Sequence, residues 1–404
     1  MTLPEELYAE LDRRLTPGDA LRLARYPGEW PERQPVHTCY VPADAVVPEL
    51  ATAWGSAALD ALDEHGLPDL GLDPQLVDEV LPRVRWKLAT EPIEDLRVDA
   101  EDGYRRSADH EDDDVLRAAA TVAADVAAGV APPSTGIRGK SLEASTRHRG
   151  VRSLDLFLGQ FRGGRAVVTL PKVTDVEQVA AFLPVLDALQ AAHQVTLDLE
   201  LQIETPQAVI GPDGAATLAR MVHVAGPRLI GLHYGTYDYS AALGIAAAQQ
   251  ASDHPAADFA KQLMQVAVAG TGAHAVDGST NVLPVGSREQ VHAAWHLHAG
   301  LVRRALERGF YQGWDLHPAQ LVTRYVATYT FFRAALPAAT GRLAAYLDRT
   351  ASGVLDEPAT ARALAAVVLR GLDCGAVDEA EILAAGGPDA ALLAKLSGRR
   401  PGGS

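Results

Sequence analysis

A regular alternation of strand-like and helix-like segments places the strongest constraint on how this chain can fold. Eight short apolar stretches have strand character, and helix-like stretches separate most of them. In chain order they are Val36–Pro42, Asp95–Ala100, Gly136–Ser141, Ala166–Pro171, Val195–Ile203, Arg228–Tyr234, Ala273–Val276 and Gly313–Leu316. Strands joined through helices run parallel, and eight such units are typical of a (β/α)₈ TIM barrel. We therefore predict this α/β fold over residues 36–335.

Two further regions flank the predicted barrel. Residues 1–35 contain a predicted amphipathic helix, 4–26, and a proline-rich linker. After Pro337 the sequence predicts short helices only, so we expect residues 336–404 to form a helical C-terminal cap whose tail is disordered from Ser397. A doubly wound open sheet is the alternative fold, but the turn after its first strand lacks the glycines of a dinucleotide-binding loop.

Composition and charge restrict the partners of the chain. The 404 residues are 48% hydrophobic, which is ample for a core, and their net charge of −16 argues against nucleic acid or an anionic membrane surface as partner. No apolar run is long enough to span a bilayer, and the first residues lack the layout of a signal peptide. Cys39 and Cys374 stand far apart, which fits a reduced, cytoplasmic setting. We expect a cytoplasmic protein that acts on a small molecule.

Two carboxylates are predicted to meet at the carboxyl ends of the strands, where barrel enzymes carry their reacting groups. Glu204 follows the fifth strand and Asp238 follows the sixth, so both are expected at the same edge of the sheet. Two hard oxygen ligands suit a divalent ion such as Mg²⁺, which usually takes one or two protein carboxylates and leaves its other positions to water and substrate. This pair indicates an enzyme.

Other predicted strand ends also carry ionisable side chains. They are Glu101, Asp102, Arg138, Lys172, Asp277 and His317. A high density of acids around one arginine and one lysine suggests a metal that polarises a carbonyl, and a guanidinium that holds carboxylate or enolate oxygens.

Eight short segments at these strand ends carry a family resemblance. They are Tyr40-Val41-Pro42, Val98-Asp99-Ala100-Glu101-Asp102, Ile137-Arg138, Leu170-Pro171-Lys172-Val173, Ile203-Glu204-Thr205, Gly235-Thr236-Tyr237-Asp238-Tyr239-Ser240-Ala241-Ala242-Leu243-Gly244, Val276-Asp277-Gly278, and Gly309-Phe310 through Leu316-His317-Pro318-Ala319-Gln320. In this order the segments resemble the HpcH/HpaI aldolase and citrate-lyase β-subunit superfamily, which includes malyl-CoA lyases.

The resemblance implies specific roles for these residues. Glu204 and Asp238 would bind Mg²⁺, with Mn²⁺ as an alternative, and Arg138 would contact the carboxylate and carbonyl oxygens of a small 2-oxo acid or an acyl-CoA. Glu101 and Asp102 would hold metal-bound waters. The remaining candidates for substrate binding are Lys172, Thr205, Asp277 and His317.

The resemblance also implies an activity and an assembly. Members typically cleave or form a carbon–carbon bond next to a carbonyl through an Mg²⁺-stabilised enolate, so the chain is expected to be a lyase or aldolase acting on a small oxo acid or hydroxyacyl-CoA. Members typically form trimers or hexamers, with the C-terminal helices contributing to a neighbour's site. A homo-oligomer is therefore expected here.

Alternatives remain open for both the residues and the function. Glu204 and Asp238 could cap helices, Arg138 could form a structural ion pair at the barrel rim, and Lys172 could pair with one of the acids. At the level of function, the alternatives are a related Mg²⁺-enolate acyl-CoA thioesterase and a catalytically inactive homologue that binds a metal or ligand for regulation.

Overall fold

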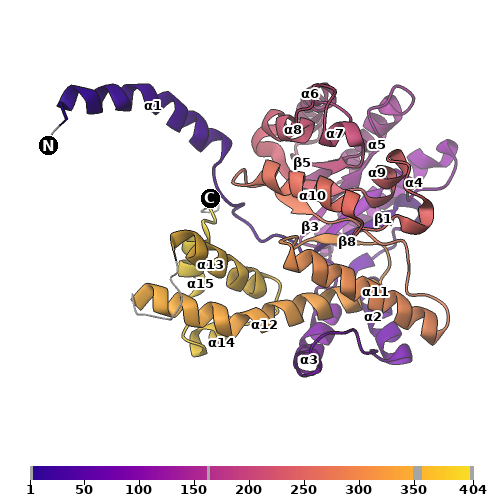
Figure 1. Ribbon diagram of the computed structural model, residues 1–404. Coiled ribbons are helices and arrows are strands. Elements are labelled where there is room, and N and C mark those ends of the chain that lie inside the picture. The colour runs from indigo at the N-terminus through magenta and orange to yellow at the C-terminus, as the bar shows by residue number, and fades with distance from the viewer. Residues whose placement is uncertain (1–2, 162–163, 349–356, 401–404) are drawn as a thin grey trace.

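The strands of the protein form one parallel sheet that curls into a nearly closed barrel (Figure 1). The structure, a computed structural model, describes residues 3–161, 164–348 and 357–400. Within these residues the strands are β1 (His37–Pro42), β2 (Asp95–Asp99), β3 (Ser134–Arg138), β4 (Arg165–Leu170), β5 (Thr196–Ile203), β6 (Leu229–Tyr234), β7 (His274–Val276) and β8 (Gly313–Asp315). Their spatial order is β7-β6-β5-β4-β3-β2-β1-β8. The predicted (β/α)₈ barrel is therefore confirmed.

The barrel is interrupted between β7 and β8. Each of these strands has three residues, and in the described part of the chain they pair with β6 and β1 but not with each other. A backbone hydrogen bond from Asp277 N–H to the carbonyl of Gln312 (2.9 Å) links the two segments beside the gap. His298 and Arg324, from two outer helices, line a small space beside Asp277 and Gly313 and contact the buried Asp315 of β8. One backbone bond and these side chains thus stand where the described chain has no strand pairing along one wall.

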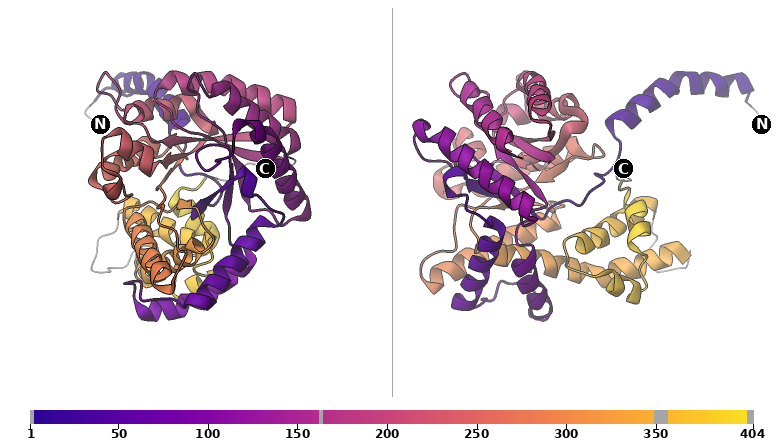
Figure 2. Two further views of the ribbon diagram at one scale, coloured as in Figure 1. Left: turned by 90° about the vertical axis from the view of Figure 1, so that its right-hand side faces the viewer. Right: turned by 180° about the vertical axis from the view of Figure 1, so that it is seen from behind.

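Helices cover the outer face of the barrel (Figure 2). Large apolar side chains such as Phe157, Phe182 and Trp295 are fully buried between helices and strands. The helices that follow the first seven strands are α2 (Leu50–His65), α3 (Pro74–Thr90), α4 (Ala108–Ala128), α5 (Arg147–Gln160), α6 (Val176–His193), α7 (Pro206–Val209), α8 (Thr217–Ala225), α9 (Thr236–Ala242), α10 (Pro255–Val268) and α11 (Arg288–Glu307). Short 3-10 turns lie at Ala43–Ala45, Gly226–Arg228 and Ala247–Gln249.

Buried ion pairs fill the middle of the barrel. Arg97 of β2 is fully buried and donates hydrogen bonds to Glu200 of β5 (2.6 Å) and to Asp95 (2.5 Å). Thr169 of β4 donates to the same Glu200 at 2.8 Å. Because each buried charge has a partner of opposite sign, the cost of removing it from water is offset. This network forms a floor beneath the carboxyl ends of the strands.

The C-terminal helices form a second, smaller core. α12 (Gln320–Asp348) leaves the barrel, α13 (Pro358–Asp373) packs against it, and α15 (Ala390–Ser397) packs against α13. α14 (Glu379–Ala384) is joined to α12 by the ion pair of Glu381 with Arg333. Leu336, Leu343, Leu369, Ile382 and Leu393 are buried there. α12 runs through the predicted boundary at residue 336, and the division into domains stays a prediction.

The predicted disordered tail lies partly outside the described residues. Of residues 397–404, those at 401–404 are not described. Arg399 pairs with Asp373, and the side chain of Arg400 donates to the carbonyl of Glu29 at 3.1 Å. The described part of the tail is therefore bonded to the body.

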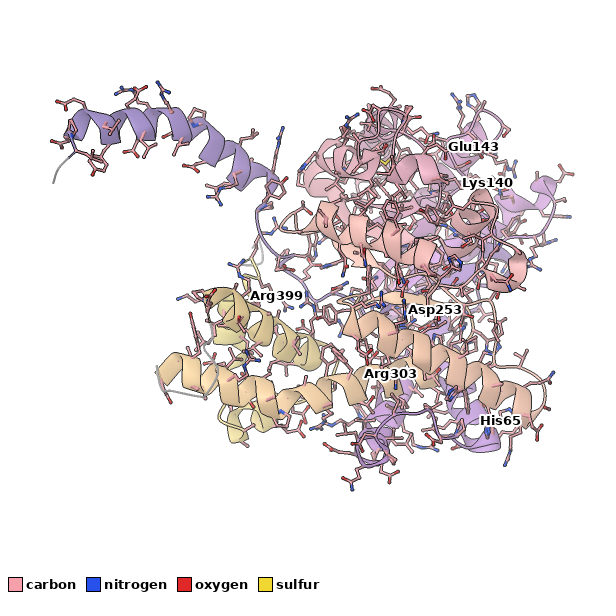
Figure 3. The ribbon with its side chains drawn as sticks, viewed as in Figure 1. His65, Lys140, Glu143, Asp253, Arg303 and Arg399 are labelled. Atoms are coloured by element: carbon pink, nitrogen blue, oxygen red, sulfur yellow. The ribbon has the colours of Figure 1, made fainter. Side chains whose placement is uncertain are left out.

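α1 (Glu5–Arg25) stands apart from the rest of the molecule (Figures 1 and 2). Its described residues include none that is buried, and Figure 3 shows its side chains projecting into solvent on all sides. Leu7, Leu11, Leu15 and Leu21 are each about half exposed or more. Across the described residues, no helix has the length and apolar content that a bilayer crossing requires.

Candidate functional site

A cavity of about 580 Å³ opens at the carboxyl ends of the strands. Its polar lining includes Asp99, Asp102, Arg138, Gln202, Glu204 and Asp238, and its apolar lining includes Tyr40, Tyr237, Leu283, Trp314 and Leu316. A second cavity, of about 120 Å³, lies at the opposite end of the barrel around the Arg97 network. The larger cavity is the candidate site because its volume suits a small molecule and it lies where barrel enzymes react their substrates.

Arg138, the last residue of β3, is held rigidly by its neighbours. Asp99 pairs with it in register and accepts two hydrogen bonds from its guanidinium, at 2.8 and 2.6 Å. The guanidinium also donates to Oε1 of Gln202 at 3.1 Å and lies 4.7 Å from the centre of the Tyr40 ring. Burial acts to lower the pKa of Arg138, but the adjacent Asp99 carboxylate raises this pKa well above its usual value. Arg138 is therefore a fixed, permanent positive charge.

Glu204, at the end of β5, is a buried carboxyl group with 1% exposure. Its Oε1 accepts the backbone N–H of Lys172 at 2.7 Å, and its Oε2 accepts the Gln202 amide at 2.6 Å. Burial raises the pKa of Glu204 to about 8; Lys172 opposes this rise, and the nearby Glu101 and Asp238 add to it. The surroundings of Glu204 therefore do not fully compensate a negative charge on its carboxyl group.

Asp238 lies on the first turn of α9, directly after β6. Its side chain is 46% exposed, and its Oδ2 lies 3.1 Å from the ammonium of Lys172. Glu204 lines the same cavity. The structure thus brings both predicted metal ligands to the same edge of the sheet, while their role as ligands stays a prediction.

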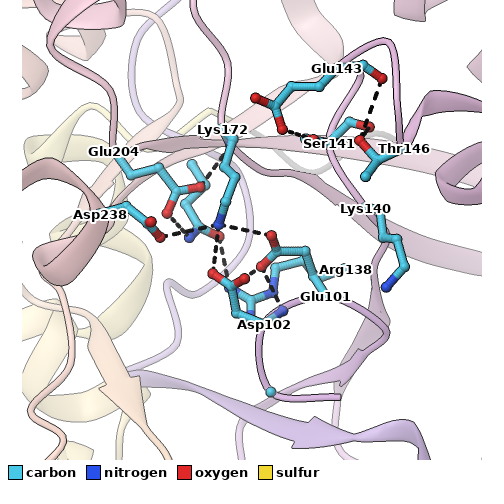
Figure 4. Close-up of polar contacts among 12 residues, drawn as sticks. Glu101, Asp102, Arg138, Lys140, Ser141, Glu143, Thr146, Lys172, Glu204 and Asp238 are labelled. Atoms are coloured by element: carbon cyan, nitrogen blue, oxygen red, sulfur yellow. Dashed lines mark hydrogen bonds and ion pairs between the residues drawn. The ribbon is translucent and has the colours of Figure 1, made fainter. Parts of the chain in front are cut away.

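Lys172 sits among the acids of the site (Figure 4). Its Nζ lies 2.9 Å from Glu101, 2.6 Å from Asp102 and 3.1 Å from Asp238. Burial acts to lower the pKa of Lys172, but Glu204 and Glu101 raise this pKa above its usual value. Burial likewise raises the pKa of Glu101, whereas the Lys172 ammonium outweighs burial and lowers the pKa of Asp102. Lys172 therefore forms ion pairs with acids of the site, as the alternative interpretation of this residue expected.

Like Glu101 and Lys172, three more predicted site residues lie outside the lining of the cavity, and these three have structural partners elsewhere. Thr205 accepts the N–H of Ala208 at 3.2 Å and caps α7. Asp277 pairs with the buried ammonium of Lys261 at 2.9 Å. His317 accepts the N–H of Ala319 at 3.2 Å through its Nδ1. Their roles in substrate binding stay predictions.

The donor set of the site fits Mg²⁺ better than a metal held by protein ligands alone. No group of three or more His, Cys, Asp or Glu side chains in the described residues is arranged to hold a metal ion. Glu204 and Asp238 nevertheless offer two carboxylates to one cavity, which is the number that Mg²⁺ usually takes from a protein. The raised pKa of Glu204 indicates that its negative charge is poorly compensated, and a divalent ion would supply the missing positive charge.

Comparison with known proteins agrees with this fold. A family model described as "Domain of unknown function (DUF6986)" matches residues 15–401. No curated protein gives a significant sequence match.

Among solved structures, a citrate lyase from Burkholderia xenovorans LB400 matches with a TM-score of 0.61 and 18% identity, over 89% of this chain and 98% of that one. A magnesium and glyoxylate complex of Haloferax volcanii malate synthase matches with a TM-score of 0.50 and 14% identity, over 72% of this chain and 75% of that one. At these identities the likeness is one of fold, and it confirms the resemblance to the citrate-lyase superfamily at that level.

Proposed function

The chain belongs to this DUF6986 family, and we propose that it is an Mg²⁺-dependent carbon–carbon lyase or aldolase that acts on a small 2-oxo acid or hydroxyacyl-CoA. The observation that carries the proposal is the position of Arg138. This fixed guanidinium lines the same cavity as two carboxylates that can share a cation. The fold likeness to a citrate lyase, and to a malate synthase in complex with magnesium and glyoxylate, supports the same class of chemistry.

Arg138 is suited to bind the oxygen atoms of an oxo acid. Asp99 accepts two of its N–H groups and Gln202 accepts a third, so the plane of the guanidinium is set before substrate arrives. Its other N–H groups can donate to carboxylate and carbonyl oxygens in the cavity. When the carbon–carbon bond breaks, negative charge collects on the carbonyl oxygen as an enolate forms, and a preorganised cation stabilises that charge.

Glu204 and Asp238 are the residues that would hold Mg²⁺. When bound, the ion would polarise the substrate carbonyl as a Lewis acid. Gln202 keeps the Glu204 carboxyl group oriented by donating to its Oε2, and the Lys172 backbone does the same at Oε1. Asp102 lines the cavity as a carboxylate that can hold a metal-bound water, and Glu101 and Asp102 both contact Lys172.

The size of the cavity is consistent with a reaction between two fragments. A volume of about 580 Å³ exceeds what a three-carbon acid needs. Tyr237, Leu283 and Leu316 form an apolar part of its wall. A second reactant or a leaving fragment can therefore occupy the space beyond Arg138.

Turnover and metal response of an Asp238→Asn variant test the proposal. The wild type should convert or condense pyruvate, glyoxylate or acetyl-CoA in the presence of Mg²⁺, as followed by NMR, and Mg²⁺ should raise its Tm through binding to the folded state. Asp238→Asn should lower turnover at least about 100-fold and lose the Mg²⁺-induced rise in Tm.

The control is His296→Gln, on the exposed face of α11, which should change neither property. If Asp238→Asn keeps both turnover and the Mg²⁺ response, the metal assignment is wrong. Metal-dependent binding of oxalate without any turnover would instead favour a regulatory homologue that binds ligand but does not react it.

A further inference from the structure

We propose that the ammonium of Lys172 and the divalent ion compete for the same carboxylates, so that metal binding displaces Lys172 from Asp238. This inference rests on the proposed metal-dependent function. In addition to that function, it assigns a role to the ammonium of Lys172, which lowers the affinity of the site for its metal.

Lys172 occupies the space between the two candidate ligands. Its backbone N–H is bound to Glu204 Oε1 at 2.7 Å, while its Nζ reaches Asp238 Oδ2 at 3.1 Å. The residue has a φ of 51°, in the left-handed region that side chains rarely adopt. This backbone conformation follows β4 and lets one residue contact both carboxylates.

All three donors of the ammonium have a carboxylate partner. Besides Asp238, the Nζ contacts Glu101 at 2.9 Å and Asp102 at 2.6 Å (Figure 4). An ion bound by Glu204 and Asp238 would have to enter this same cluster. Two cations a few ångströms apart repel strongly in a partly buried site, so the ammonium and the metal exclude each other at Asp238.

The side chain of Lys172 has a way to leave without losing its charge partners. It is 22% exposed, and Asp102 is 56% exposed. Because lysine has a flexible four-carbon stem, the ammonium can give up Asp238 and stay with Asp102 and Glu101. Only one of its three contacts is therefore exchanged for the metal.

A Lys172→Ala variant with chemical rescue tests the competition. The substitution removes the ammonium and three methylenes, which propylammonium can replace. Mn²⁺ binding, measured by EPR of the free ion, should become at least about tenfold tighter, because the metal no longer has to displace the ammonium from Asp238. Propylammonium should then weaken Mn²⁺ binding to the variant competitively, with little effect on the wild type. Propan-1-ol, a neutral molecule of similar size, should have no effect.

Two further variants make the outcome decisive. Arg105→Ala removes another cation that lines the cavity, so it measures the general effect of one lost positive charge. If it tightens Mn²⁺ binding as much as Lys172→Ala, or if propylammonium does not compete, the inference is wrong. Should Lys172→Ala not fold, Lys172→Met keeps the stem without the charge and should show the same tightening.

Failure of the inference differs from failure of the proposed function. Equal or weaker Mn²⁺ binding by the Lys172 variants, with binding by the wild type intact, overturns the competition alone. If neither the wild type nor the variants bind Mn²⁺, both the competition and the metal-dependent function are overturned.

Discussion

Glu204 carries a carboxyl group whose charge is poorly compensated by its surroundings. The group is almost completely buried, and its two hydrogen-bond donors are a backbone N–H and a neutral amide. Burial penalises the charged form, and nearby acids add to that penalty, so the pKa of Glu204 rises to about 8. Without metal, Glu204 therefore keeps its proton up to about pH 8, and a bound divalent ion would favour the charged form.

This shift predicts how stability depends on pH in metal-free buffer. Below pH 4.5, the usual pKa, Glu204 is protonated in both folded and unfolded chains and contributes nothing. As pH rises to about 8, the pKa in the folded state, only the unfolded chain loses the proton, so the free energy of unfolding falls. Relative to Glu204→Gln, the wild type should lose roughly 3 to 5 kcal/mol across this range.

Urea unfolding at several pH values measures the difference between the two proteins. Comparing them removes the contributions of other titrating groups, such as Glu101 and Asp102, to the extent that the substitution leaves their pKa values unchanged. A difference that stays constant between acid and neutral pH would contradict the assignment.

Strand ends made the main site residues predictable, but their partners were harder to find. Glu204, Asp238, Arg138 and Lys172 were expected at one edge, and they do line or border one cavity. Gln202 was missed, although it lies two residues before Glu204 and so points to the same side of the strand.

Asp99 was missed as a functional residue for a related reason. It ends β2 and pairs in register with Arg138, but the register of two strands is fixed by the assembled sheet. In the same way, the partners of Thr205, Asp277 and His317 come from packing that local sequence does not reveal.

At the level of elements, the turn from β6 into α9 positions both predicted metal ligands. Gly235, in this turn, lies so close to Glu204 that an added Cβ would sit 2.4 Å from the Glu204 Cβ and 2.7 Å from its Oε2. The φ of Gly235 is −96°, which any residue can adopt. Glycine is therefore required here for space, not for backbone conformation.

Replacing Gly235 with alanine should push Glu204 out of place. We expect a loss of about 1 to 3 kcal/mol in stability from overpacking, together with loss of the Mg²⁺-induced rise in Tm. Gly300→Ala is the matched control, because nothing lies within 4 Å of its added Cβ in α11. That variant should gain about 0.5 to 1 kcal/mol and keep its metal response. Calorimetry with and without Mg²⁺ checks both, and an intact metal response in Gly235→Ala would count against the placement of Glu204.

Two short helices, α7 with four residues and α9 with seven, escaped prediction for a physical reason. α9 has seven residues, too few to show a helical period, and its Asp238 was read as a strand end. A helix was expected to start near Pro318, and α12 does start at Gln320, although its first half is buried on nearly all sides and has no solvent-facing stripe. Longer helices with one buried apolar face, such as α4 and α10, were found from their period, and the strands were found as short apolar runs that are buried on both faces.

At the scale of the whole molecule, α1 contributes no burial to the fold. Removing residues 1–25 should change the free energy of unfolding by less than about 0.5 kcal/mol, because no described residue of α1 is buried. Thermal unfolding of the shortened chain checks this.

A longer deletion through residue 35 gives the contrast. It also removes Arg33, which donates to Glu91 at 2.7 Å, and the N–H of Gly28, which donates to Gly270 at 2.9 Å. This second deletion should be clearly destabilising. A large loss of stability on removing residues 1–25 alone would mean that α1 packs against something in solution.

The break between β7 and β8 gives the barrel wall a preferred line of weakness. In a closed ring of strands, every joint is a ladder of backbone hydrogen bonds, and widening the ring at any point must break one. Here, within the described residues, β7 and β8 are joined by one backbone hydrogen bond, from Asp277 to Gln312, and side chains of α11 and α12 lie beside the joint. The wall can therefore open slightly along this joint while the hydrogen bonds of all seven strand pairs stay intact.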